Sequence, residues 1–138
     1  MTRDEMLAMK PGRELDELVI RHIMNIPVVE SVDIFSQEPF PAAWWVEDEG
    51  WYIADERDED GLIYRPFNPS EDISAAWEVV GKLQNDYVLD FKLERKYCVA
   101  EMKFVAVFED LDGKKWVAHG WIAPEAICKA ALLAVMDG

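Results

Sequence analysis

The chain has 138 residues, of which 51% are hydrophobic, and a formal net charge of −14 with an isoelectric point near 4.4. The length and hydrophobic fraction predict one folded domain over residues 1–138 and argue against a disordered chain. The strong negative charge disfavours direct binding to nucleic acid or to an anionic membrane. The first residues are followed by no apolar h-region, so we expect no secretory signal.

The cysteine and histidine content argues against a metal site. Cys98 and Cys128 are expected to be reduced, buried thiols of a cytoplasmic protein, with a disulfide between them as the alternative. The two cysteines and two histidines, at positions 22, 98, 119 and 128, do not have the spacing of zinc ligands. The sequence therefore predicts no cofactor.

Two helices are predicted at the N-terminus. Thr2 followed by Glu5 is a capping-box pattern for a short helix over residues 4–9, and a second helix begins near Arg13 and ends before Pro27. Its apolar stripe is predicted to consist of Leu15, Leu18, Val19, His22 and Ile26. Its polar face is predicted to consist of Arg13, Glu14, Asp16, Glu17 and Arg21. We therefore expect His22 to be a hydrogen-bonded core histidine.

Residues 27–69 form an irregular section that is rich in acidic and aromatic residues. Residues 28–35 suit a short edge strand, residues 44–46 and 51–53 a β-hairpin, and residues 62–64 one more strand. The tryptophans of this hairpin are Trp44, Trp45 and Trp51. A short hairpin cannot bury all three, so at least one is expected to face a partner or ligand.

An acidic run lies within this section. Residues 47–60 contain eight acids and one base, a net charge of −7. A calcium loop would fit Asp58, Asp60 and Gly61, but Phe67 stands where the bidentate glutamate is required, so that interpretation fails. A surface that mimics DNA and solvated hairpin tips without function both remain open.

The C-terminal half is predicted to alternate a helix, three strands and a helix. Ser70 is the expected N-cap of a helix with Ile73, Ala76, Trp77 and Val80 on one face, which makes Trp77 a core residue. Strands are expected over residues 87–92, 98–109 and 114–121, with a hairpin turn at residues 110–113. This order predicts an α+β fold, a layered α/β sandwich with an antiparallel sheet of about three to five strands and three main helices.

The last helix, over residues 123–136, is apolar almost all round. Lys129 is the only polar side chain between Ala126 and Met136, so the helix must be covered on most sides. Part of that cover is expected from the sheet and the rest from the helix near Arg13 or from a second subunit. We therefore expect a homo-oligomer formed through residues 123–136, with Lys129 reaching solvent or an anion at the subunit boundary.

Several segments carry a family resemblance. Residues 72–80 and 123–134, together with residues 1–5 and 12–19, resemble proteins of the phage ABA sandwich domain family from Bacillus-type phages and prophages. The resemblance covers nearly the whole chain except residues 27–60. It implies a phage or prophage origin, a location in the host bacterial cytoplasm and a layered α/β sandwich. The family carries no established enzymatic chemistry, so it supplies no catalytic residues and we expect a non-enzymatic protein.

By analogy with other small phage proteins, we expect a counter-defence factor that binds and sequesters a small nucleotide-derived immune signal. The alternatives are an acidic, DNA-mimic-like inhibitor of a host enzyme and a virion assembly protein. The candidate ligand-binding residues are cations and aromatics of this acidic chain: Trp45, Arg57, Arg65, Arg95, Lys114, Lys115, Trp116 and Lys129. An indole beside two lysines would stack a base and hold a phosphate, whereas ordinary packing of the strand is the simpler interpretation of Trp116.

Overall fold

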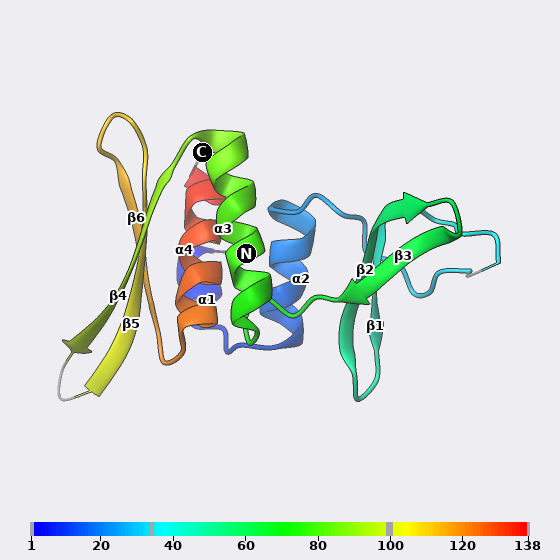
Figure 1. The fold of residues 1–138 in the computed structure, drawn as a ribbon. Coiled ribbons are helices and arrows are strands. Elements are labelled where there is room, and N and C mark those ends of the chain that lie inside the picture. The colour runs from blue at the N-terminus through cyan, green and yellow to red at the C-terminus, as the bar shows by residue number, and fades with distance from the viewer. Residues whose placement is uncertain (1, 34, 99–100, 138) are drawn as a thin grey trace.

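The helices lie between two antiparallel sheets in the computed structural model, which describes residues 2–33, 35–98 and 101–137 (Figure 1). The helices are α1 (Arg3–Leu7), α2 (Arg13–His22), α3 (Ile73–Tyr87) and α4 (Ala123–Asp137). One sheet has the order β1 (Ala42–Val46), β2 (Gly50–Asp58), β3 (Gly61–Pro66), and the other β4 (Asp90–Cys98), β5 (Glu101–Glu109), β6 (Lys115–Gly120). The predicted α+β sandwich is confirmed, with its strands divided between two sheets.

Helix α4 is the centre of the molecule. It packs against β5 and β6 on one side and against α1, α2 and α3 on the others. Residues 126–134 are all buried, with at most 6% of their surface exposed. The cover that this apolar helix requires therefore comes from its own chain. A homo-oligomer through residues 123–136 is not needed to bury the helix and stays a prediction.

The β4–β5–β6 sheet presents one face to α4. Along β6, Trp116, Ala118 and Gly120 are buried against the helices, while the residues between them are exposed. Phe91, Phe108 and Trp116 are aligned across the three strands, so three aromatic rings cover one end of the helical layer. The predicted turn between β5 and β6 is confirmed.

The boundaries of β4 and β5 correct two sequence predictions. The strand expected to begin at Tyr87 begins at Asp90, because Tyr87 is the last residue of α3 and Val88 is its left-handed C-cap with φ of 52°. The strand expected over residues 98–109 is divided, since β4 ends at Cys98 and β5 starts at Glu101. The two residues between them lie outside the described part of the chain, as does the side chain of Cys98. Cys128 is a free, buried thiol.

The N-terminal helices confirm one prediction and correct another. Thr2 caps α1 as predicted, with its hydroxyl oxygen accepting the Glu5 backbone N–H at 3.1 Å. The buried stripe of α2 runs through Leu15, Asp16, Val19 and Ile20. His22, predicted to be core, is exposed, and Asp16, predicted to be solvated, is buried. The stripe is rotated by about one residue, because the face that packs on α4 includes Asp16, whose carboxylate accepts the Ser70 N–H.

Helix α3 differs from its prediction at both its cap and its aromatic residue. Asp72 is the N-cap, and its carboxylate accepts the Ser74 backbone N–H at 2.9 Å. Ser70, the predicted cap, is buried two residues earlier. Trp77 is 48% exposed and meets the Phe91 ring only edge-on, with centroids 5.6 Å apart. The buried face of α3 consists of Ala75, Ala76, Val79, Val80 and Leu83.

The irregular section forms the second sheet. The predicted hairpin is confirmed, with Trp44 opposite Tyr52 and Trp45 opposite Trp51. Trp51 is buried, and its indole N–H donates to the Arg13 carbonyl at 3.0 Å, which ties this sheet to α2. Residues 27–41 contribute only isolated bridges in their described part. No helix within the described residues is long and apolar enough to cross a bilayer.

Candidate functional site

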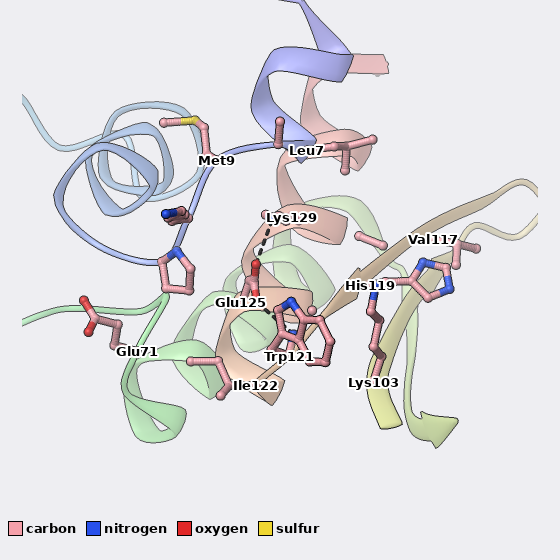
Figure 2. Close-up of a pocket in the computed structure, with 15 residues that line it drawn as sticks. Leu7, Met9, Glu71, Lys103, Val117, His119, Trp121, Ile122, Glu125 and Lys129 are labelled. Carbon is pink, nitrogen blue, oxygen red and sulfur yellow. Dashed lines mark hydrogen bonds and ion pairs between the residues drawn. The ribbon is translucent and has the colours of Figure 1, made fainter. Parts of the chain in front are cut away.

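A cavity with a volume of about 910 Å³ lies where β6 leads into α4 (Figure 2). Residues 7–11, from the end of α1 to the segment before α2, form one side of it, and residues 117–122 form the other. Lys103 on β5 and Glu71, just before α3, complete the rim. Four parts of the chain that are distant in sequence therefore meet at this cavity.

A buried ion pair forms the floor of the cavity. The Lys129 ammonium lies 2.8 Å from Oε2 of Glu125, one turn earlier on α4, and the two side chains are only 6% and 7% exposed. Oε1 of Glu125 accepts the backbone N–H of Trp121 at 2.9 Å. Burying a lysine requires a partner of opposite charge, and Glu125 of the same helix supplies it. The anion expected near Lys129 is therefore intramolecular.

An exposed indole and a lysine form the wall. The Trp121 ring is 57% exposed, and the Lys103 ammonium lies 4.9 Å from its centroid. His119 lies beside them in the close-up (Figure 2). An accessible aromatic ring beside a cation can stack a planar base and hold a phosphate group.

Gly120 allows the wall to approach the start of α4. A Cβ atom at this position would lie 2.8 Å from the Ala126 backbone nitrogen and 3.0 Å from the Glu125 side chain. A side chain here would push β6 away from α4 or displace Glu125. Glycine therefore permits the close strand-to-helix contact on which the position of Trp121 depends.

The cavity is locally more positive than the chain as a whole. Its described lining contains the lysines Lys10, Lys103 and Lys129 against Glu71 and Glu125, a formal balance of three minus two, or +1. The entire chain carries −14. Lys10 is exposed, and Lys103 is about one-third exposed, with the nearest paired carboxylate at 4.0 Å. An anionic ligand would therefore meet at least two accessible ammonium groups here.

The structure does not bring the eight predicted binding residues together. Of the eight, Lys129 alone belongs to the described lining of this cavity. The Arg57 guanidinium donates to the Gln37 carbonyl at 2.8 Å, and Arg65 pairs with Glu78 at 2.7 Å and with Asp55 at 3.6 Å. Arg95 is exposed on β4. These arginines lie on separate strands.

The aromatic members of that set are also separate from the cavity. Trp116 is 7% exposed and faces the helices, so a ligand cannot stack on its ring. Lys114 lies 5.1 Å from the Trp116 ring centroid, and Lys115 is an exposed residue of β6. Trp45 is half-buried between the Arg13 guanidinium at 4.7 Å and the Trp51 ring at 5.6 Å. Trp121 therefore replaces Trp116 as the aromatic residue of the site.

Sequence reasoning missed Trp121 although a signal was present. Trp116 shares its strand face with Ala118 and Gly120, and two small residues in phase with a tryptophan indicate close packing on a helix. Trp121 follows the end of this alternation and precedes the Pro124 that marks the helix start. The phase of Trp121 is opposite to that of Trp116, Ala118 and Gly120, so it is expected on the outward face. Lys103 follows the Phe104–Gly120 pair in the β5–β6 register, so the hairpin predicted around residues 110–113 already places it opposite Trp121. Glu71 carries no local signal, because only the tertiary fold brings it to the cavity.

A second buried polar cluster joins α2 to the segment before α3. A carboxylate oxygen of Asp16 accepts the Ser70 backbone N–H at 2.7 Å, and the Ser70 hydroxyl oxygen accepts the Gly12 N–H at 2.8 Å. Burial raises the pKa of Asp16 from 3.8 to about 7, against the lowering effect of the Ser70 hydrogen bonds. Burial also raises the pKa of the nearby Cys128 thiol. The hydrogen bonds of this cluster join α2 to the segment before α3, and the residues that make them do not line the cavity.

Comparison with protein families matches residues 17–132 to the phage ABA sandwich domain. No curated protein and no solved structure matched the chain. The matched span begins within α2 and ends within α4, so it includes both sheets, Trp121 and the Glu125–Lys129 pair. Residues 7–11 of the cavity precede it.

Proposed function

The chain belongs to the phage ABA sandwich domain family and is therefore a phage-associated protein; on this premise we propose that it is a non-enzymatic accessory protein that sequesters a small anionic ligand. The ligand class is a nucleotide-derived immune signal, with its base against Trp121 and its phosphates near Lys103 and Lys10. Sequestration in the host bacterial cytoplasm would lower the signal available to host defence, which makes the protein a counter-defence factor.

The accessible pair of Trp121 and Lys103 is the observation that carries this proposal. The Trp121 ring is more than half exposed while the Lys103 ammonium lies 4.9 Å from its centroid, so aromatic and cationic contacts occur at one place. A cavity volume of about 910 Å³ falls within the range of about 300–1,000 Å³ typical of small-molecule sites. Both support a ligand that combines a planar ring with negative charge.

The buried ion pair at the floor of the cavity helps to hold Trp121 in place, which favours ligand binding. The Glu125 carboxylate holds the Trp121 backbone through one oxygen and Lys129 through the other. The backbone of Trp121, two residues before α4, is thereby held against the first turns of a buried helix. A pre-positioned ring loses less entropy on binding, which favours affinity.

Isothermal titration calorimetry against cyclic mono- and dinucleotides and the isomers of cyclic ADP-ribose tests the proposal. We expect saturable heat with at least one of these compounds. Trp121→Ala and Lys103→Ala should each weaken binding by about tenfold, since stacking on one aromatic side chain contributes about 1–3 kcal/mol per base.

Lys114→Ala is the matched control, because Lys114 also lies over a tryptophan ring but outside the cavity. Its affinity should equal that of the wild type. If Lys114→Ala abolished the binding heat and Lys103→Ala retained it, the ligand would bind at the turn between β5 and β6 instead of in the cavity. No heat with any compound would refute the nucleotide-binding proposal.

A further inference from the structure

Three aromatic rings surround a small cavity on the outer face of the β1–β2–β3 sheet. Trp44 and Tyr52 are cross-strand partners with nearly parallel rings, 6.1 Å between centroids and 17° between planes. Tyr64 of β3 is inclined to both, with its centroid 6.0 Å from Trp44 and 6.3 Å from Tyr52. We name Trp44, Tyr52 and Tyr64 the aromatic cluster.

The aromatic cluster faces away from the core. Trp51 and Ile53 point toward α2 and are buried, whereas Tyr52 between them points outward. Tyr64 is 50% exposed. The cavity beside the rings, about 270 Å³, also contacts Val32, Val46 and Leu62. This volume is below the range typical of sites for drug-sized ligands and suits a single side chain.

The surroundings of the aromatic cluster are acidic. The described lining of its cavity holds the Glu49 carboxylate and no cation, and Glu49 accepts the Tyr52 hydroxyl at 3.1 Å. The turn at residues 47–49 joins β1 to β2, and the turn near residues 58–60 joins β2 to β3, so acidic turns lie at both ends of the sheet. Residues 47–60 carry a net charge of −7.

Aromatic faces and carboxylates attract the same kind of ligand. A Lys or Arg side chain is stabilised when it lies within about 6 Å of an aromatic centroid, and more so when several rings surround it. The negative field of the acidic turns attracts a basic segment and accelerates its association. The rings are exposed to an incoming chain, so the two contributions can act together.

We infer that the aromatic cluster is a docking site for a basic protein segment, with one Lys or Arg side chain entering the cavity that Trp44, Tyr52 and Tyr64 line. Charge selects this occupant. A second copy of the chain would bring another −14, and nucleic acids and anionic membranes are repelled as well. A neutral sugar could stack on the rings but would gain nothing from the net charge of −7 on residues 47–60. This site is separate from the cavity beside Trp121.

Calorimetry with a short peptide of alternating lysine and glycine tests the inference, and the same peptide with every lysine acetylated is the neutral match. The unmodified peptide should bind at least about tenfold more tightly. Trp44→Leu and Tyr64→Leu keep an apolar side chain without a π face and should each weaken binding about fivefold. Trp44→Phe keeps a ring and should retain most of the affinity. Trp121→Ala should leave peptide binding unchanged, which separates this test from that of the nucleotide site.

Four results would overturn the inference. Equal affinity for the acetylated peptide would show that charge does not contribute to binding. Undiminished binding by both leucine variants would show that the acidic turns attract the peptide without the aromatic rings. Tight binding of cellohexaose that Trp44→Leu abolishes would identify a sugar platform. A concentration-dependent dimer in sedimentation equilibrium, lost in Trp44→Leu, would identify a second copy. Circular dichroism spectra of the variants establish that each is folded.

Discussion

The ammonium of Lys129 lies 2.8 Å from a carboxylate oxygen of Glu125, one turn away on α4, with both side chains almost completely buried. The same carboxylate accepts the backbone N–H of Trp121. One glutamate therefore neutralises the single cation in the apolar part of α4 and fixes the entry to that helix. The stability of α4 and the position of the exposed indole depend on the same side chain.

Removing one partner of this ion pair should lower the free energy of unfolding more than removing both. Lys129→Met leaves a buried carboxylate without its counter-ion, and we expect a loss of about 3 kcal/mol or more in the free energy of unfolding. The double variant Lys129→Met, Glu125→Gln leaves no buried charge and should recover much of that loss. Urea unfolding monitored by tryptophan fluorescence measures both.

The exposed pair of Arg21 and Glu17 on α2 is a matched control with the same i, i+4 spacing. Its atoms are 3.2 Å apart, but the side chains are 46% and 39% exposed. Arg21→Met should change stability by less than about 0.5 kcal/mol, because solvent screens the interaction. Equal costs for the Arg21 and Lys129 variants would contradict the role that we assign to burial.

Asp16 should make the protein less stable as the pH rises. Burial raises its folded-state pKa from 3.8 to about 7, so between these values the folded state keeps a proton that the unfolded state releases. The contribution of Asp16 to the free energy of unfolding is therefore highest below about pH 4. It falls as the pH approaches 7, by at most about 1.4 kcal/mol per pH unit.

Asp16→Asn removes this contribution while keeping an oxygen that can accept the Ser70 N–H. The variant should gain stability relative to the wild type as the pH is raised from 5 to 8, and urea unfolding at four pH values measures that difference. Asp112→Asn, at an exposed turn position, should track the wild type at every pH. A constant difference between wild type and Asp16→Asn would show that Asp16 is already ionised in the folded protein at pH 5.

Val88 is a β-branched residue in a left-handed conformation at the end of α3, with φ of 52°. Such residues adopt this conformation at a cost of about 1–2 kcal/mol, and glycine adopts it freely. Val88 is 63% exposed, so its side chain contributes little burial. Val88→Gly should therefore stabilise the protein by about 1 kcal/mol in thermal or urea unfolding. Val117→Gly, on β6, should destabilise it, since that residue is in a strand.

Local patterns in the sequence predict most of the elements and fewer of their faces. The N-cap at Thr2, the turn around Gly113 and the apolar run after Pro124 each specify a local structure, and the structure contains all three. Val88 interrupts the apolar alternation of the strand predicted over residues 87–92. The residue instead terminates a helix, since α3 runs through Tyr87 and Val88 is its left-handed C-cap.

Burial of polar residues could not be predicted in the same way. Asp16 was placed on the solvated face of α2 and His22 on the apolar face, and the structure reverses both. Asp16 can be buried because Ser70, 54 residues later, donates to it, and a helical periodicity carries no information about that partner. The cavity has a similar origin, since Lys10 and Trp121 are brought together by the packing of α1 and β6 on α4.

Gly120 and Gly81 should respond in opposite ways to the same added methyl group. At Gly120 the new Cβ would lie 2.8 Å from the Ala126 backbone nitrogen, so Gly120→Ala must separate β6 from α4 and should cost about 1–3 kcal/mol. At Gly81, within α3, no atom lies within 4 Å of the new Cβ, and alanine should stabilise the helix by about 0.5–1 kcal/mol. Thermal unfolding compares the two variants. Because Gly120 precedes Trp121, Gly120→Ala should also weaken the binding of any ligand beside that indole. A Gly120→Ala protein as stable as the wild type would contradict the close packing of β6 on α4.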